Sequence, residues 1–143
     1  GDKQNGKDDF TKCPNGAPGV ETRMPIVFSE GVSKGRLSLN EFAAVTSTNP
    51  AKIFGMYPKK GVLAPGSDAD IVLMNPDMEV TITKNILHEN VDYTPYEGIQ
   101  VKGWPVMTMV RGQAVVENER LQVPLGFGRY INRKPVKYTE LLK

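Results

Sequence analysis

Residues 59–74 read KKGVLAPGSDADIVLM, and this stretch decides the fold that the sequence predicts. Pro65-Gly66 is typical of a turn, because proline presets φ and glycine tolerates positive φ. The apolar run Ile71–Met74 is too short for a helix and too apolar for a half-exposed strand, so we expect a strand covered on both faces. The stretch therefore marks a change from helices before it to β-strands after it.

Three short helical segments are expected before this stretch. The first covers residues 21–32. The second begins at Ser38, which forms a capping box with Glu41. The third begins at Asn49-Pro50, with asparagine at the cap and proline in the first turn, and it ends at Gly55.

The residues after Met74 predict β-structure with one irregular interruption. Residues 78–83 form a second strand beside Ile71–Met74, and Asn75-Pro76-Asp77 is the turn between them. Residues 84–102 carry weak signals and predict an irregular excursion. A hairpin follows, with strands at 105–110 and 113–117 joined across Arg111-Gly112. Two further segments follow: a glycine-rich loop at 123–130, and a terminal tail or helical turn at 138–143.

The composition is that of one ordinary globular domain. The chain has 143 residues, 39% hydrophobic and 24% charged, with a net charge of +2. Its densest basic cluster has neither a recognition helix nor an aromatic platform beside it, so we expect no nucleic-acid partner. No apolar run reaches transmembrane length, so we expect no membrane partner. One cysteine, Cys13, cannot form an intramolecular disulfide, which fits a reducing compartment.

The residues alone do not assemble a complete active site. His88 is the only histidine, so a zinc site of two or three histidines cannot be built from this chain. Asp68 and Asp70 point the same way along a strand and could bind a cation, although polar capping of a strand entrance is the commoner explanation. Residues 13–19 hold two prolines and two glycines, which predicts a loop with exposed peptide groups. That loop is either a ligand contact or a plain connector.

A set of motifs, in order along the chain, resembles the dihydropyrimidinases and hydantoinases, a branch of the cyclic amidohydrolases. The match spans almost the whole chain, and only one of its motifs, GSDADI, is common to the wider group. The motifs are DDFTKCPNGAPGVETRM (8–24), AVTSTNPAKIF (44–54), YPKKG (57–61), GSDADIV (66–72), YEG (96–98) and GRYINRKP (128–135).

The resemblance implies an α/β fold with added β-structure. It implies the C-terminal part of an amidohydrolase (β/α)8 barrel, followed by the C-terminal strands of a composite β-sandwich. The last loop and helices of the barrel would occupy residues 1–58, the sandwich strands residues 59–123, and a C-terminal tail residues 124–143. The chain would then be the C-terminal quarter to third of a longer polypeptide, a view that fits its start at Gly1 rather than at methionine.

The resemblance also implies an activity: zinc-dependent hydrolysis of dihydropyrimidine or hydantoin rings to N-carbamoyl amino acids. The ligands of the two zinc ions lie outside this chain, the last of them shortly before Gly1, so the 143 residues alone are expected to be inactive and to hold no catalytic residue. One substrate contact carries over, the backbone of Asn15. Asp68 and Asp70 then belong to structure rather than to a metal site.

Two alternatives stay open beside the enzyme. The first is a non-catalytic dihydropyrimidinase-related scaffold, although those relatives tend to have glutamate where this chain has Asn15. The second is an independent β-rich interaction module, which would leave the edge of Ile71–Met74 exposed to aggregation. For the enzyme, the expected partners are a small cyclic amide, the remainder of the same polypeptide, and identical subunits in a cytoplasmic homotetramer.

Overall fold

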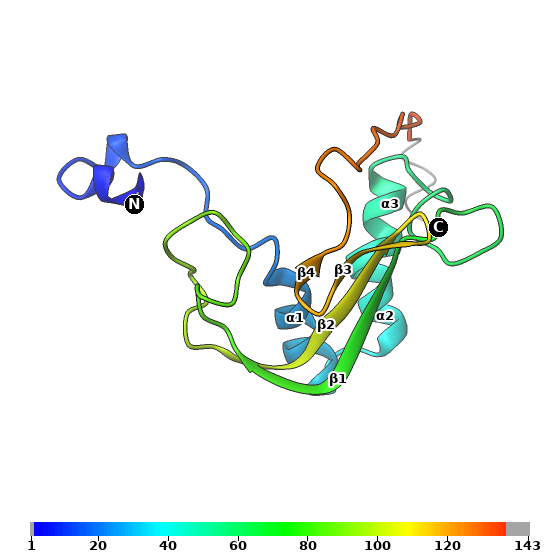
Figure 1. The fold of residues 1–143 in the computed structure, drawn as a ribbon, viewed down its shortest axis with the longest axis horizontal. Helices are drawn as coiled ribbons and strands as arrows, with labels where there is room; N and C mark the ends of the chain where they lie inside the picture. The colour runs from blue at the N-terminus through cyan, green and yellow to red at the C-terminus, as the bar shows by residue number, and fades with distance from the viewer. Residues whose placement is uncertain (1, 137–143) are drawn as a thin grey trace.

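The computed structural model describes residues 2–136 and places two helical segments on one face of a four-stranded antiparallel sheet (Figure 1). The strand order is β1-β2-β3-β4. The strands are β1 (Ile71–Thr81), β2 (Gln100–Val110), β3 (Gln113–Glu117) and β4 (Arg120–Leu121). An α/β fold with an antiparallel sheet is therefore confirmed for this chain.

The first helical segment confirms the helix predicted over residues 21–32. It consists of α1 (Arg23–Val27), continued without a break by η3 (Phe28–Ser33). Hydrogen bonds to both peptide groups of Lys102 fix it to β2. The Ser33 hydroxyl donates to the Lys102 carbonyl over 3.0 Å, and the Lys102 N–H donates to Ser29 Oγ over 3.1 Å.

The second helical segment begins as predicted. Ser38 and Glu41 form both hydrogen bonds of the capping box at the start of α2 (Leu39–Ala43). The helix predicted at Asn49-Pro50 is present as α3 (Asn49–Ile53), but its separate start is wrong, because η4 (Ala44–Thr48) joins it to α2 as one helical run. The Asn49 N–H donates to the Ala44 carbonyl, five residues back. This wide turn lets the helix pass Pro50, which lacks an N–H and would crowd an ordinary turn.

The turn predicted at Asn75-Pro76-Asp77 is also wrong, because β1 runs through it as one strand. Asn75 pairs with Trp104, and the next pair joins Glu79 to Lys102. Residues 76–78 therefore bulge opposite the single residue Gly103. Both apolar runs find their hydrogen-bond partners on β2, and the bulge accommodates a proline that cannot donate to the ladder.

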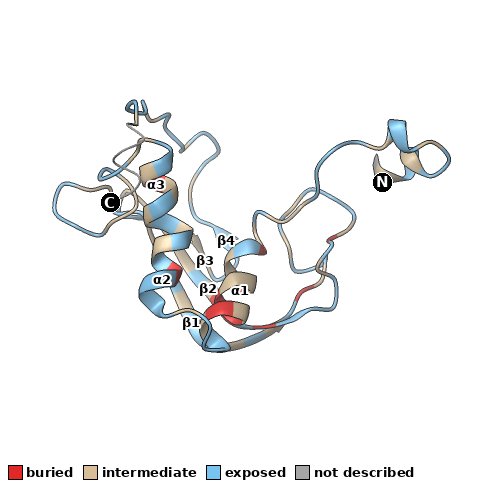
Figure 2. Cartoon of the chain, turned by 180° about the vertical axis from the view of Figure 1, so that it is seen from behind, coloured by how far each residue is buried: buried red, intermediate tan, exposed pale blue. Residues whose placement is uncertain are grey.

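The expectation that Ile71–Met74 is covered on both faces is not met within the described residues. The Leu73 side chain is 46% exposed, and β1 is an edge strand of the sheet. Successive side chains of a strand point to opposite faces, and the helices cover only one face of this sheet (Figure 2).

The hairpin predicted across Arg111-Gly112 is confirmed. Val110 of β2 pairs with Gln113 of β3. Both turn residues have positive φ, 52° at Arg111 and 79° at Gly112, as the two-residue turns of hairpins require. The irregular excursion is confirmed over residues 82–99, although β2 starts earlier than predicted, at Gln100.

The core lies where the first helical segment meets β2 and the base of the excursion (Figure 2). Ile82, Val101 and Trp104 form its buried cluster, with 0%, 3% and 6% of their surfaces exposed. Phe28 adds to it from the helical side and meets Phe42 of α2 edge-on, with the ring centroids 5.3 Å apart. The same contact therefore packs both helical segments together.

The N-terminal residues extend away from this body (Figure 1). Asp2–Gly6 form the 3-10 helix η1. A second 3-10 helix, η2 (Phe10–Lys12), is capped by Asp9, whose carboxylate accepts from the Thr11 N–H. Residues 123–130 have no helix or strand, as predicted. The tail predicted at 138–143 lies outside the described residues.

Candidate functional site

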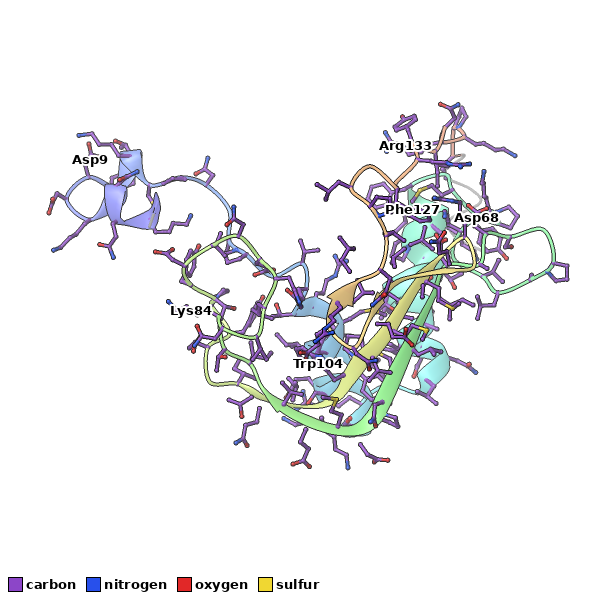
Figure 3. All side chains as sticks on the ribbon, viewed as in Figure 1. Asp9, Asp68, Lys84, Trp104, Phe127 and Arg133 are labelled. Carbon is purple, nitrogen blue, oxygen red and sulfur yellow. The ribbon has the colours of Figure 1, made fainter. Side chains whose placement is uncertain are left out.

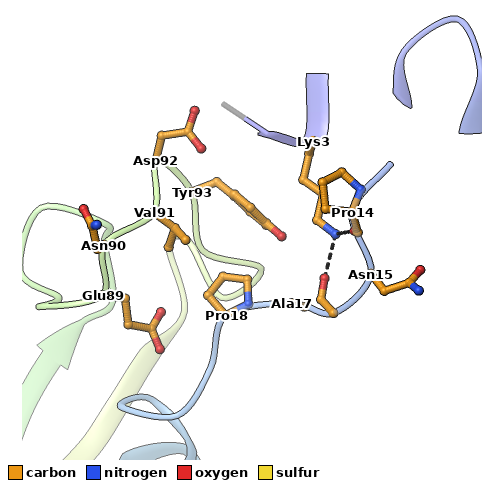
Figure 4. A pocket seen from close by; sticks show the side chains of 11 residues that line it. Lys3, Pro14, Asn15, Ala17, Pro18, Glu89, Asn90, Val91, Asp92 and Tyr93 are labelled. Carbon is orange, nitrogen blue, oxygen red and sulfur yellow. Dashed lines mark hydrogen bonds between the residues drawn. The ribbon is translucent and has the colours of Figure 1, made fainter. Parts of the chain in front are cut away.

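The loop that follows η2 presents backbone groups to a cavity of about 730 Å³. The Lys3 ammonium donates to the carbonyls of Pro14 and Gly16, the latter over 2.6 Å (Figure 4). The Asn15 side-chain amide points away from the cavity. Within the described part of the chain, no hydrogen bond occupies the N–H or the carbonyl oxygen of Asn15 itself. The loop therefore offers peptide groups, rather than a charged side chain, to a ligand.

Gly16 gives this loop its shape. Its φ is +84°, a left-handed conformation that side chains other than glycine's adopt at a cost. A Cβ added there would meet no atom within 4 Å, so the requirement for glycine comes from the backbone and not from crowding. The turn at Gly16 brings the carbonyls on either side of Asn15 within reach of one donor.

A second wall faces this loop across the cavity, formed by residues 89–93 of the excursion. Figure 4 shows the Tyr93 ring extending toward the segment 14–18. Backbone hydrogen bonds from the Ile82 N–H to the Ile99 carbonyl and from the Gly98 N–H to the Ile82 carbonyl, both 2.8 Å, close the base of the excursion. The excursion that contains the second wall is therefore anchored to the core at Ile82.

Sequence analysis did not predict this second wall or the position of Lys3. The two walls of the cavity are more than seventy positions apart in the sequence, and no local sequence pattern predicts that they lie together. One signal was present: the excursion is a long irregular segment in a compact domain, and segments of that kind are usually functional or disordered.

His88 lies next to the second wall and joins three segments. Its Nδ1 is 2.7 Å from Glu21 Oε1, and its Nε2 is 3.1 Å from the Glu119 carbonyl oxygen. The His88 side chain is 61% exposed. The structure shows that this exposed ring connects the excursion to Glu21, two residues before α1, and to the turn between β3 and β4.

The two aspartates considered as cation ligands are held by a lysine instead. Lys60 Nζ contacts Asp70 Oδ2 and lies 2.9 Å from Asp68 Oδ2. The Asp70 carboxylate also accepts from the Arg111 N–H over 2.9 Å. The Arg111 guanidinium lies over the Phe127 ring, 4.5 Å from its centroid, at the end of the sheet where Figure 3 also labels Asp68. Through Asp70, this cluster connects the stretch 59–74 to the turn of the β2–β3 hairpin.

The cluster of Lys60, Asp68 and Asp70 predicts that the unsubstituted protein and a Lys60 variant differ in how their stability falls at acid pH. The hydrogen bond from Lys60 lowers the pKa of Asp68 below its ordinary value of 3.8. A group with a lowered folded-state pKa stabilises the fold above its unfolded value and loses that contribution as the pH falls through the folded value. We therefore expect Lys60→Met to lower the free energy of unfolding at pH 7 and to flatten its decline below pH 3.8.

Urea unfolding as a function of pH measures this difference. Lys34→Met is the matched control, because Lys34 forms an exposed pair with Glu30 on the helix surface, and we expect a smaller loss from it. Equal losses for the two variants, with parallel pH curves, would contradict a special role for Lys60.

No metal centre is built from the described residues. Within residues 2–136, no group of three or more histidine, cysteine, aspartate or glutamate side chains could hold an ion. Cys13 is a free thiol beside the Asn15 loop, with its sulfur 3.8 Å from the Pro14 carbonyl oxygen. None of the helices described is long and apolar enough to cross a membrane.

The comparisons with known proteins agree with this geometry. The family model described as "Amidohydrolase family" matches residues 12–115, a range that includes the Asn15 loop, the excursion and most of the sheet. The chain belongs to the amidohydrolase family. Within the family, its resemblance to dihydropyrimidinases and hydantoinases is confirmed by the relatives that it matches.

Three of these relatives show how far the similarity extends. The D-hydantoinase of Geobacillus stearothermophilus is 46% identical over 142 residues, which is 99% of this chain and 30% of that protein. The D-phenylhydantoinase of Escherichia coli O1:K1 is 46% identical over 90% of this chain and 28% of its own length. The crystal structure of dihydropyrimidinase from Brevibacillus agri NCHU1002 is 51% identical, with a TM-score of 0.92 over 96% of this chain and 30% of that chain.

This amidohydrolase chain thus spans about 30% of the length of the curated relatives that it matches. The backbone fold of the described residues is that of a known solved enzyme over the shared range. Any role in the whole protein has to be argued from the groups that this chain contributes.

Proposed function

We propose that the whole protein that contains these residues hydrolyses a cyclic amide. Its relatives are named D-hydantoinase, D-phenylhydantoinase and dihydropyrimidinase, which supports a dihydropyrimidine or hydantoin ring as substrate and an N-carbamoyl amino acid as product. In this proposal the chain supplies a substrate-binding loop and its supporting sheet, and no catalytic side chain.

The observation that carries this role is the contact between the Lys3 ammonium and the two carbonyls that flank Asn15. An N–H donor is bound there by backbone oxygens alone. A cyclic imide or ureide presents an N–H between two carbonyls on its ring edge. Such an edge pairs with the N–H and the carbonyl of a single residue, which together supply a donor and an acceptor, and the N–H and carbonyl of Asn15 have no other partner among the described residues.

The resemblance implies two zinc ions, which would activate water and polarise the ring carbonyl in metal-assisted hydrolysis. The residues described here do not fit such a centre, because they bring no three ligands together. We propose that segments outside this chain hold the metal. What the loop contributes is orientation: it holds the ring edge so that the scissile amide has one position.

Two measurements on the whole protein test this function. Metal analysis is expected to find two zinc ions per subunit, and incubation with dihydrouracil or a hydantoin is expected to yield the N-carbamoyl product. Protein that contains no zinc and opens neither ring would contradict the proposal and favour the non-catalytic scaffold. The same resemblance leads us to propose a homotetramer, which sedimentation of the whole protein tests.

A substitution in the loop separates substrate binding from general stability. Gly16→Ala strains the turn that positions the Asn15 peptide groups, and we expect kcat/KM of the whole protein to fall by about ten- to a hundredfold, the loss typical of misplaced binding groups. Gly126→Ala is the matched control, because Gly126 also has φ +84° and no atom near its Cβ position. Equal effects of the two alanines on kcat/KM would contradict a binding role for the loop.

A further inference from the structure

The second wall of the cavity has little structure of its own. Residues 89–93 form neither helix nor strand, and their backbone hydrogen bonding includes one short-range contact, from the Val91 N–H to the Glu89 carbonyl over 2.8 Å. Their position opposite the Asn15 loop therefore depends on how the excursion is held at its sides. Asp92 of this wall has an interaction of its own, and the hydrogen bonds that join the excursion to Glu21 and to Glu119 are made by His88 and Glu89.

Glu21 holds this part of the excursion by three contacts. Its carboxylate accepts from the His88 backbone N–H over 2.7 Å and contacts the His88 ring nitrogen Nδ1, also over 2.7 Å. Its own N–H donates to Glu89 Oε1 over 3.4 Å. Glu21 lies between the Asn15 loop and α1, so these contacts tie the first wall of the cavity directly to the start of the second.

The His88 ring is placed so that only one protonation state satisfies it fully. Nδ1 faces a carboxylate oxygen and Nε2 faces the carbonyl oxygen of Glu119, and both of these groups are acceptors. A neutral imidazole has one N–H, whereas an imidazolium has two. The doubly protonated ring therefore donates to both neighbours, and the neutral ring loses one of the two contacts.

We propose that Glu21 and His88 are a positioning pair for the substrate site: the charged pair sets the separation between residues 14–18 and residues 89–93. The inference rests on the proposed function in its claim about substrate affinity. Neither residue touches the reacting ring. The pair acts through Glu89–Tyr93, whose side chains line the cavity, and so it affects binding rather than the chemical step.

The charges around His88 favour the charged state of the pair. Glu21 lies before α1, Glu119 on the turn between β3 and β4, and Glu89 on the excursion, while Arg23 of α1 lines the same groove as His88. The hydrogen bond and charge of Glu21 raise the pKa of His88 above its ordinary value of 6.5, partial desolvation opposes them, and the Glu119 carbonyl adds to the rise. A raised folded-state pKa means that the stabilising contact is complete below pH 6.5 and is lost as the pH rises through the folded value.

Steady-state kinetics of the whole protein test the pair. His88→Gln and Glu21→Gln are each expected to raise KM for the ring substrate by about two- to fivefold, the range of exposed charge pairs, with kcat unchanged. KM of the unsubstituted protein is expected to rise with pH through the His88 titration, and this rise is expected to disappear in His88→Gln. Glu30→Gln, which breaks the exposed Glu30–Lys34 pair elsewhere, is the control and is expected to leave KM unchanged.

Hydrogen–deuterium exchange of residues 84–98 gives a readout that does not need activity. At about pH 6, where the imidazolium is populated, these amides are expected to exchange about two- to fivefold faster in His88→Gln than in the unsubstituted protein. This difference should vanish above the His88 pKa. If the whole protein opens no ring, the proposed function fails and exchange alone decides whether the pair holds the wall. Unchanged exchange overturns the inference, and so does an active enzyme whose KM matches that of the Glu30→Gln control.

Discussion

Replacing Gly103 with alanine is expected to lower the free energy of unfolding by about 2–5 kcal/mol, combining overpacking with left-handed backbone strain. Gly103 lies in β2 opposite the bulge of β1, with φ +102°. A Cβ there would be 2.2 Å from Phe28 Cδ1 and 2.6 Å from Cε1. Phe28 is 4% exposed and packed edge-on against Phe42, so its ring has no free space into which it could move.

Gly98→Ala isolates the backbone part of this effect. Gly98 also has positive φ, +80°, but a Cβ there would meet no atom within 4 Å. We expect a loss of about 1–2 kcal/mol from this control, the cost of a left-handed conformation alone. Urea unfolding of both variants measures the difference. If the two alanines cost the same, the close approach of β2 to Phe28 does not exist in the protein.

The second large effect is expected at Ile82, where the excursion leaves the sheet. Ile82 is 0% exposed and packs with Val101 and Trp104. Ile82→Ala is expected to cost about 2–5 kcal/mol, from lost burial and from the cavity that remains. Because Ile82 also closes the base of the excursion, the variant is expected to loosen residues 89–93 as well.

Ile99→Ala is the matched control for Ile82→Ala. Ile99 is the hydrogen-bond partner of Ile82 across the base of the excursion, but its side chain is 40% exposed. We expect the free energy of unfolding to fall by about 1 kcal/mol or less, since folding removes less of the apolar area of Ile99 from water. Thermal or urea unfolding gives both values. A larger loss at Ile99 than at Ile82 would place the core elsewhere.

The features that were predicted correctly from the sequence depend on residues that lie close together along the chain. The Ser38–Glu41 capping box depends on residues three apart, and the structure contains both of its hydrogen bonds. The Arg111-Gly112 hairpin depends on two turn residues between apolar runs, and it forms with the expected positive φ angles. In both cases the neighbours along the chain determine the geometry, so no knowledge of distant contacts was needed.

The predictions that failed involve proline in an ordinary local context. Asn75-Pro76-Asp77 has the composition of a turn, yet β2 offers partners on both sides of it, and the strand continues through a bulge. Asn49-Pro50 has the composition of a helix start, yet the wide turn at η4 carries the helix past it. In both places tertiary pairing outweighed a local preference, which a reading of the sequence alone does not detect.

Only one of the two walls of the candidate site could be predicted from the sequence. Asn15 was assigned from the family resemblance and from a loop rich in proline and glycine, and that loop does border a cavity. The opposing residues 89–93, and the Glu21–His88 pair beside them, depend on contacts across 67 or more positions of the chain. Those contacts exist only once the excursion has folded back onto Glu21, two residues before α1.

A crystal structure of the whole protein with a cyclic imide bound would show directly whether the Asn15 loop binds the substrate ring. We predict that the ring N–H lies about 2.7–3.2 Å from the backbone carbonyl oxygen of Asn15, a hydrogen-bond distance, between the two carbonyls that bind the Lys3 ammonium here. A ring held only by side chains, or bound away from the Asn15 loop, would contradict the account.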